Sequence, residues 1–347
     1  ALGSDTSLLQ RIFDDTATKL ERSEIEDERI AGELHLLIGH AYSSIGDFHA
    51  SEHHLQQSIR IRERLLGSED IETIRSRMQL ALLRSNQGRM REAVRMNEEL
   101  HPHLVRLVGP EEKETIGHEI NLAQGYWALE ELERARALGE AALAKAERVL
   151  GEDDEYTLNA ANNVGLVLNS LGHPAEAERY FQRVHETWRR EVGPDHPATL
   201  TAIGNLALTL LARHEVEEAE RLHSDVVNTL TRICGEEHVR TLNARMGLAG
   251  AYVATGKLGE AQALLENVAD VAKRALSPEH KINLGIQSQL AGVYAQSGRH
   301  GDAADLARES AAKARRVLGD RSPLALRYVD RSAITFETLR LPDEAHD

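Results

Sequence analysis

The chain has 347 residues, a formal net charge of −15 and 4% aromatic residues. The negative charge argues against nucleic acid as the main partner, because a phosphate backbone attracts a basic surface. No stretch approaches the length of a membrane span, and the first residues lack the basic region and apolar run of a secretory signal. The sequence therefore favours a soluble, cytoplasmic protein with no membrane role. Its apolar residues are mostly Leu, Ala, Val and Ile, which suit packed helices better than sheets.

Three series of small residues recur with a period of 42 residues. The series after each second helix is Gly67, Gly109, Gly151, Gly193, Gly235, Ser277 and Gly319. The series in the turn inside each repeat is Gly46, Gly88, Glu130, Gly172, His214, Gly256, Gly298 and Arg340. The third series is Ala93, Ala135, Ala177, Ala219, Ala261, Ala303 and Ala345. A fixed period predicts a solenoid of stacked repeats, and we see no internal boundary in it.

Two amphipathic helices fill each period. In one repeat, Leu200, Ile203 and Leu206 follow the spacing of a buried helix face. The expected first helices are 31–45, 73–87, 115–129, 157–171, 199–213, 241–255, 283–297 and 325–339. The expected second helices are 48–66, 90–108, 132–150, 174–192, 216–234, 258–276 and 300–318. The sequence thus predicts one solenoid over 1–347, with a half repeat at 6–22, repeats at 31–66, 73–108, 115–150, 157–192, 199–234, 241–276 and 283–318, and a terminal partial repeat at 325–347.

Proline and the exceptions to glycine make further predictions about the turns. Pro174 and Pro342 stand where a second helix begins, a position that tolerates the missing N–H. Pro102 falls inside a second helix, where it is expected to kink or shorten it. Strained or differently closed turns are expected where the left-handed cap lacks glycine, at Glu130, His214 and Arg340.

The repeats resemble the tetratricopeptide repeat, in the 42-residue form of the kinesin light chain. The resemblance is carried by GPDHPATLTAIGNLALTLLARHEVEEAERLHSDVV at 193–227, with its G-x-x-H-P-x-T-L, N-L-A and E-A-E elements. It covers nearly the whole chain, with departures at Arg84, Ser277 and Asn283. The family implies an all-α, right-handed superhelix of helix pairs. Its first helices line a concave groove that binds peptides or partner proteins.

The sequence offers little catalytic or metal-binding chemistry. His49 and His53 have the spacing of two ligands on one helix face, but no third ligand is evident. His196, His238 and His280 recur in one loop register and look like turn residues. Cys234 aligns with apolar helix-end residues and is expected to be a small buried hydrophobe. Without a phosphate loop, a paired-cysteine motif or a nucleophile elbow, we expect no enzyme activity, metal or cofactor.

The family resemblance instead directs attention to the inward-facing positions of the first helices. These candidate peptide-binding residues are Arg75, Gln79, Asn121, Gln124, Trp127, Asn159, Asn163, Asn205, Asn243, Gln289, Arg327 and Arg331. A primary amide both donates and accepts hydrogen bonds, so a series of them suits the main chain of an extended peptide. The arginines would favour acidic groups. Alternatively, the amides cap turns or join adjacent helices, and Trp127 packs on a neighbouring repeat.

We therefore expect a non-enzymatic scaffold that holds a peptide or protein segment. Similar arrays follow kinase or nucleotide-switch domains in large bacterial proteins, so the sensor region of such a protein is an alternative. A third is a self-assembly module. The last expected first helix lacks a complete partner helix, and its residues Ile334, Phe336 and Leu339 predict weak association through the terminal helices.

Overall fold

The computed structural model describes residues 13–318, apart from 21, 23, 24, 46, 277–279 and 281. All regular structure in this part is α-helical, beginning with a helix at 13–20. The further helices are α2 (Glu28–Ile45), α3 (Phe48–Leu66), α4 (Ile71–Asn86), α5 (Met90–Leu107), α6 (Lys113–Ala128), α7 (Leu132–Leu150), α8 (Glu155–Ser170), α9 (Pro174–Glu191), α10 (Pro197–Ala212), α11 (Val216–Cys234), α12 (Val239–Ala254), α13 (Leu258–Ala275), α14 (Ile282–Gln296) and α15 (His300–Leu318). The predicted all-α fold is confirmed.

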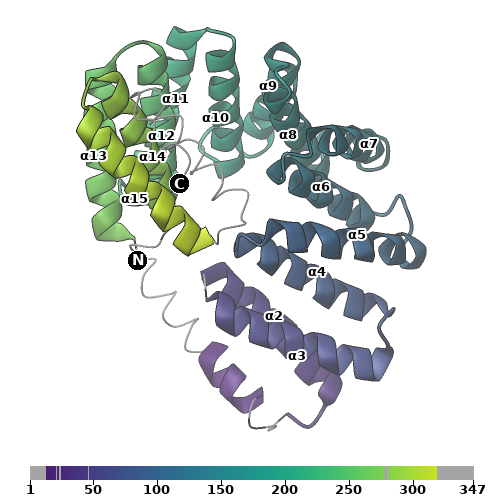
Figure 1. Ribbon diagram of the computed structural model, residues 1–347. Helices are drawn as coiled ribbons and strands as arrows, with labels where there is room; N and C mark the ends of the chain where they lie inside the picture. Colours follow the sequence, from purple (N-terminus) through teal and green to yellow (C-terminus); the bar gives the residue numbers. More distant parts are fainter. Residues whose placement is uncertain are drawn as a thin grey trace. The chain divides into compact units, whose positions relative to one another are not determined.

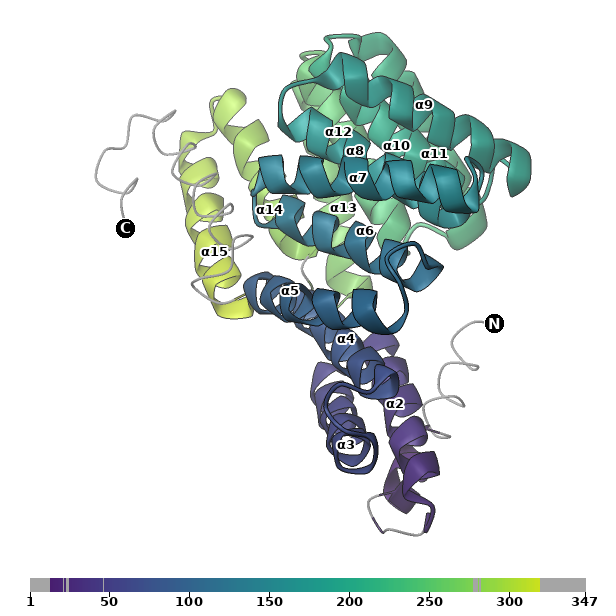
Figure 2. The same ribbon diagram turned by 90° about the vertical axis from the view of Figure 1, so that its right-hand side faces the viewer.

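The helices belong to two compact units, unit 1 (Ala1–Glu131) and unit 2 (Leu132–Asp347). In unit 1, α2 packs on α3, α4 on α5, and α5 on α6. In unit 2, each helix from α7 to α15 packs on the next one along the chain. Figures 1 and 2 show these helices side by side within each unit. Each unit is thus a series of helical hairpins.

The predicted helix boundaries lie close to those observed. The second helices expected at 48–66, 132–150, 216–234 and 300–318 have those limits. First helices begin up to three residues earlier than expected, as α2 does at Glu28. Pro174 is the first residue of α9, whereas α5 runs through Pro102 to Leu107 without being shortened. The expected segments at 6–12 and 325–347 lie outside the described residues.

The repeating glycines close the turns in the left-handed conformation. Gly151 has a φ of 92° and Gly235 a φ of 83°, values that only glycine adopts without strain. Glu130 and His214 adopt φ values of 63° and 62°, the left-handed region in which strain is expected for residues other than glycine. Arg340 lies outside the described residues.

In four of the described inter-repeat loops, a threonine six residues after the loop glycine fixes that loop to the next first helix. The Thr73, Thr115, Thr199 and Thr241 hydroxyls donate to the carbonyls of Gly67, Gly109, Gly193 and Gly235, at 2.6–2.9 Å. The buried Thr157 hydroxyl has no such partner in the described structure. A residue three positions after the loop glycine, or after Ser277 in the last of these loops, accepts a backbone N–H near the helix start; these residues are Asp70, Asp154, His196, His238 and His280. The predicted turn role of the three histidines is therefore confirmed.

Small residues allow the two helices of a repeat to approach closely. The alanines of the third series that the structure describes are buried, including Ala177 and Ala219 at 0% exposure. A Cβ added to Gly39 would lie 2.8 Å from Leu55 Cγ, and one added to Gly165 would lie 2.7 Å from Phe181 Cζ. The core between paired helices therefore leaves no room for a methyl group at these positions.

Ion pairs repeat along the exposed side of the loops. Arg106 pairs with Glu69, Arg190 with Asp153 and Arg232 with Asp195, each 37 residues apart and at 2.6–2.8 Å. Such exposed pairs contribute little individually to stability.

One expectation about the core is wrong. Cys234, at the end of α11, is exposed rather than buried. Its equivalents Leu66 and Val192 are also exposed, whereas Val108, Leu150 and Leu276 are half-buried, so the packed helix pair covers this helix-end position only in part. None of the described helices is long and apolar enough to cross a membrane.

Candidate functional site

Four first helices of unit 2 form one continuous face. Helix α10 contacts both α8 and α12, and α12 contacts α14. We call the solvent-exposed surface of α8, α10, α12 and α14 that carries the predicted binding positions the first-helix face. It presents the predicted binding residues of this unit, which are Asn159, Asn163, Asn205, Asn243 and Gln289. The side chains of Asn159 and Asn243 are exposed, and the other three are half-buried.

Three of these amides are free of protein partners. Within the described part of the chain, no residue hydrogen-bonds the side chain of Asn159, Asn163 or Asn243. Asn159 and Asn163 are four residues apart on α8, so they lie on the same side of that helix. Asn243 occupies the position equivalent to Asn159 two repeats later. These donors and acceptors are available to a ligand.

Asn205 joins adjacent helices, which is the alternative role predicted for these amides from the sequence. Its Nδ2 donates to Asn162 Oδ1 at 2.8 Å and thereby joins α10 to α8. A second amide bridge joins the same helices, because Asn169 Nδ2 donates to Thr209 Oγ1 at 2.7 Å. Sequence reasoning did not single out Asn162 or Asn169. The signal was the spacing of 43 residues between Asn162 and Asn205, which brings them together across adjacent repeats.

Gln289, on α14, presents a different arrangement. Its Oε1 is screened from solvent and accepts no hydrogen bond from any described residue. A buried acceptor without a donor is costly. Because this carbonyl oxygen is screened from solvent, it does not present an acceptor to a ligand as the exposed amides do.

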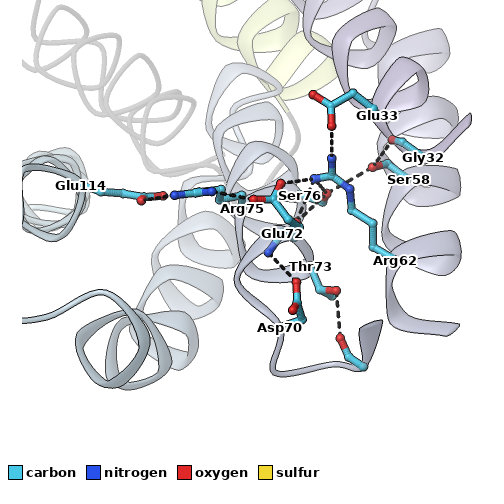
Figure 3. Close-up of polar contacts among 11 residues, drawn as sticks. Gly32, Glu33, Ser58, Arg62, Asp70, Glu72, Thr73, Arg75, Ser76 and Glu114 are labelled. Atoms are coloured by element: carbon cyan, nitrogen blue, oxygen red, sulfur yellow. Dashed lines mark hydrogen bonds and ion pairs between the residues drawn. The ribbon is translucent and has the colours of Figure 1, made fainter. Parts of the chain in front are cut away.

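Arg75 of unit 1 is already neutralised within the protein. Its Nε and Nη2 donate to the two carboxylate oxygens of Glu114 on α6, at 2.9 and 2.8 Å. Its Nη1 donates to Glu72 at 2.6 Å (Figure 3). These carboxylates raise the pKa of Arg75, and Arg75 lowers the pKa of Glu114. An acidic ligand would have to compete with both carboxylates for this guanidinium.

The neighbouring Arg62 holds three helices of unit 1 together. Its side chain is almost fully buried, and Nη1 donates to Glu72 O and to Ser76 Oγ on α4, each at 3.0 Å. Its Nη2 donates to Glu33 on α2 at 3.0 Å (Figure 3). Arg62 is therefore a structural residue, since every contact it makes is internal to the unit.

The other predicted residues of unit 1 lie on α4 and α6. Gln79 is half-buried, and Asn121 and Gln124 are exposed, with no hydrogen bond from their side chains to other described residues. Trp127 is half-buried near the end of α6. Arg327 and Arg331 lie outside the described residues.

Four of the histidines lie in two close pairs. His35 Nδ1 lies 2.8 Å from His54 Nδ1 in the interior of unit 1, and burial lowers the pKa of His35 to about 4. His101 stacks on His118, with ring centroids 5.6 Å apart. In the part of the chain that the structure describes, no group of three or more His, Cys, Asp or Glu residues is placed to hold a metal ion.

A family model described as "Tetratricopeptide repeat" matches residues 31–102, 114–187, 156–231, 202–274 and 240–312. No curated protein matches the chain. A solved structure of nearly identical TPR-like repeats, from a putative kinesin light chain of Podosopora anserina, is 26% identical. The match covers 58% of this chain and 95% of that one, with a TM-score of 0.50.

Two more distant structures share the fold. The structure of NprR in complex with its cognate peptide NprX is 14% identical, and the match covers 97% of this chain and 90% of that one with a TM-score of 0.59. A signal transduction ATPase with numerous domains from Pyrococcus horikoshii, which carries a tetratricopeptide repeat sensor, is 15% identical. That match covers 97% of this chain and 50% of that one, with a TM-score of 0.51.

Proposed function

Because the chain belongs to the tetratricopeptide repeat family, we propose that it is a non-enzymatic scaffold that binds an extended peptide or protein segment. The binding surface is the first-helix face of unit 2. Repeats of this family generally serve protein interaction, and one fold serves many ligands, so the ligand is determined by the residues on the face.

The unpaired amides of Asn159, Asn163 and Asn243 carry this proposal. Each offers a donor and an acceptor that the described protein leaves unused. A peptide main chain offers the complementary groups at every residue, whatever its side chains are. Each hydrogen bond contributes a net gain of about 0.5–1.5 kcal/mol, from which the cost of ordering the peptide must be subtracted. These amides alone therefore give the peptide a modest affinity.

The structural neighbours are consistent with such a role. NprR has a similar fold and was solved with its cognate peptide bound. The TPR sensor of the Pyrococcus horikoshii ATPase favours a second proposal, in which this chain is the sensor region of a larger signalling protein. Both proposals require the same ligand surface, and they differ in what the bound segment controls.

The test is a selection of random peptides, displayed on phage, against the whole chain. Asn159→Ala, Asn163→Ala and Asn243→Ala should each weaken the selected peptides about 2- to 12-fold, which corresponds to the loss of one hydrogen bond. Asn228→Ala is the matched control, because Asn228 is an exposed asparagine on the second helix α11.

Urea unfolding should show the same midpoint for all four variants, since none of these side chains bonds another described residue. If the selected peptides bind Asn159→Ala, Asn163→Ala and Asn243→Ala as tightly as they bind the Asn228→Ala control, the first-helix face is not the binding surface.

A further inference from the structure

Charge is distributed very unevenly over the helices of unit 2. Helices α10 and α14 contain no Asp, Glu, Lys or Arg, α8 contains one such residue and α12 contains two. The second helix α9 alone contains eight in 18 residues. In a chain with 28% charged residues, the first helices of this unit are therefore exceptional.

The three charges on these helices lie away from the centre of the first-helix face. Glu155 is the first residue of α8, and Arg240 is the second residue of α12. The Arg245 side chain is only 11% exposed, lies 3.4 Å from Glu236 and donates to Asn267 on α13. It therefore points to the second helix of its own repeat.

Uncharged groups occupy the rest of the face. Asn159, Asn163 and Asn243 contribute amides, and Thr201 occupies the equivalent position between Asn159 and Asn243. Leu208 on α10 is 50% exposed. Its equivalent on α12 is Gly250, where an added Cβ would meet no atom within 4 Å. The position equivalent to Leu208 on α12 is thus open.

Apart from Glu155 and Arg240, which lie one turn before Asn159 and Asn243 at the helix starts, the helices of this surface offer no exposed charge to compensate one on a ligand. An ionised side chain laid against the rest of the surface would lose hydration without gaining an opposite charge. Main-chain amides of the ligand would instead find the asparagines, and an apolar side chain would cover Leu208.

We propose that the segment recognised by unit 2 is an electrically neutral, extended peptide that places an apolar side chain against Leu208. This inference rests on the proposed function of the first-helix face. It identifies the chemical class of the ligand, which the fold alone leaves open.

The test uses synthetic peptides taken from the phage selection described above. Their affinity should change less than about twofold between low and high salt, because no ion pair contributes to binding. Replacing the peptide's central uncharged residues one at a time by Asp or by Lys should weaken binding about tenfold or more at one position at least, for either sign of charge.

A charge placed on the face supplies the positive control. Thr201 is exposed, and its hydroxyl bonds only its own helix. Thr201→Lys should restore binding of an Asp-substituted peptide while leaving the Lys-substituted peptide weak. Urea unfolding of this variant should match that of the parent chain.

Two results separate the inference from the function it rests on. If the selected peptides are strongly acidic or basic, or lose tenfold in affinity with salt, while the asparagine variants still weaken them, the ligand is charged and the inference is wrong. If no peptide is selected, or the asparagine variants have no effect, the proposed function itself fails and the inference fails with it.

Discussion

Replacing Gly165 by Ala tests the close packing of helix pairs. A Cβ at this position in α8 would lie 2.7, 2.9 and 3.1 Å from three ring carbons of Phe181, which is fully buried on α9. A rigid aromatic ring in a close-packed core cannot yield without shifting its helix. Forcing an extra methyl group into such a core costs about 1–3 kcal/mol.

A second glycine provides the reference for this measurement. Gly204 lies in α10, and a Cβ there would meet nothing within 4 Å. Alanine is better than glycine in a helix interior by about 1 kcal/mol, and this gain applies to both sites. Gly204→Ala should therefore stabilise the protein by about 1 kcal/mol. The free energy of unfolding of Gly165→Ala should be about 1–3 kcal/mol lower than that of Gly204→Ala.

The assay is urea unfolding followed by two probes. Far-UV circular dichroism reports all helices, and tryptophan fluorescence in a Trp127→Phe background reports Trp188 on α9, because the chain has two tryptophans. Agreement between the probes checks whether the transition is cooperative enough for a free energy to be extracted. Equal stabilities for the two alanine variants would refute the packing argument.

Three further predictions concern turns and buried groups. His214→Gly should raise the free energy of unfolding by about 1 kcal/mol in a denaturant titration, because it removes left-handed strain at a φ of 62°; an unchanged or lower value would mean that the histidine is not strained. Thr241→Val should cost about 0.5–1.5 kcal/mol by the loss of the hydrogen bond to Gly235. Thr157→Val should cost less, since that hydroxyl has no partner among the described residues; equal costs in calorimetry would contradict this reading. Burial lowers the pKa of His223 to about 4, so below pH 6.5 the unfolded chain takes up a proton that the folded chain refuses. Protonation of this one group should lower the free energy of unfolding by about 3 kcal/mol as the pH drops from 7 to 4, and His223→Leu should remove this part of the pH dependence of the urea midpoint.

Much of the fold was predictable because its signals are local and repeated. Helices α7 and α11 end just before Gly151 and Gly235, because the left-handed turn at each glycine stops the helix whatever packs against it. Cys234 was misplaced because an apolar series at a helix end resembles a core position. Sequence periodicity does not show how far packing covers this position, which is exposed in some repeats and half-buried in others.

The candidate site was less predictable, because it depends on contacts between repeats. Arg75 reads as a free cation in the sequence, but Glu114, 39 residues later, holds it. Asn205 resembles Asn163 in register, yet only Asn205 donates to Asn162. Which amides remain free for a ligand is decided by side-chain geometry across adjacent helices.

The fixed spacing of the hydrogen bonds has a consequence for how such a chain can change in length. The threonine-to-glycine bond spans six residues and the loop ion pair spans 37, and both recur at intervals of whole periods. Removal of 199–240 would place Thr241 where Thr199 stood, six residues after Gly193. Duplication or loss of one period in the gene would therefore reuse contacts that already exist. The length of the binding surface can evolve in whole-repeat steps, without the invention of a new interface.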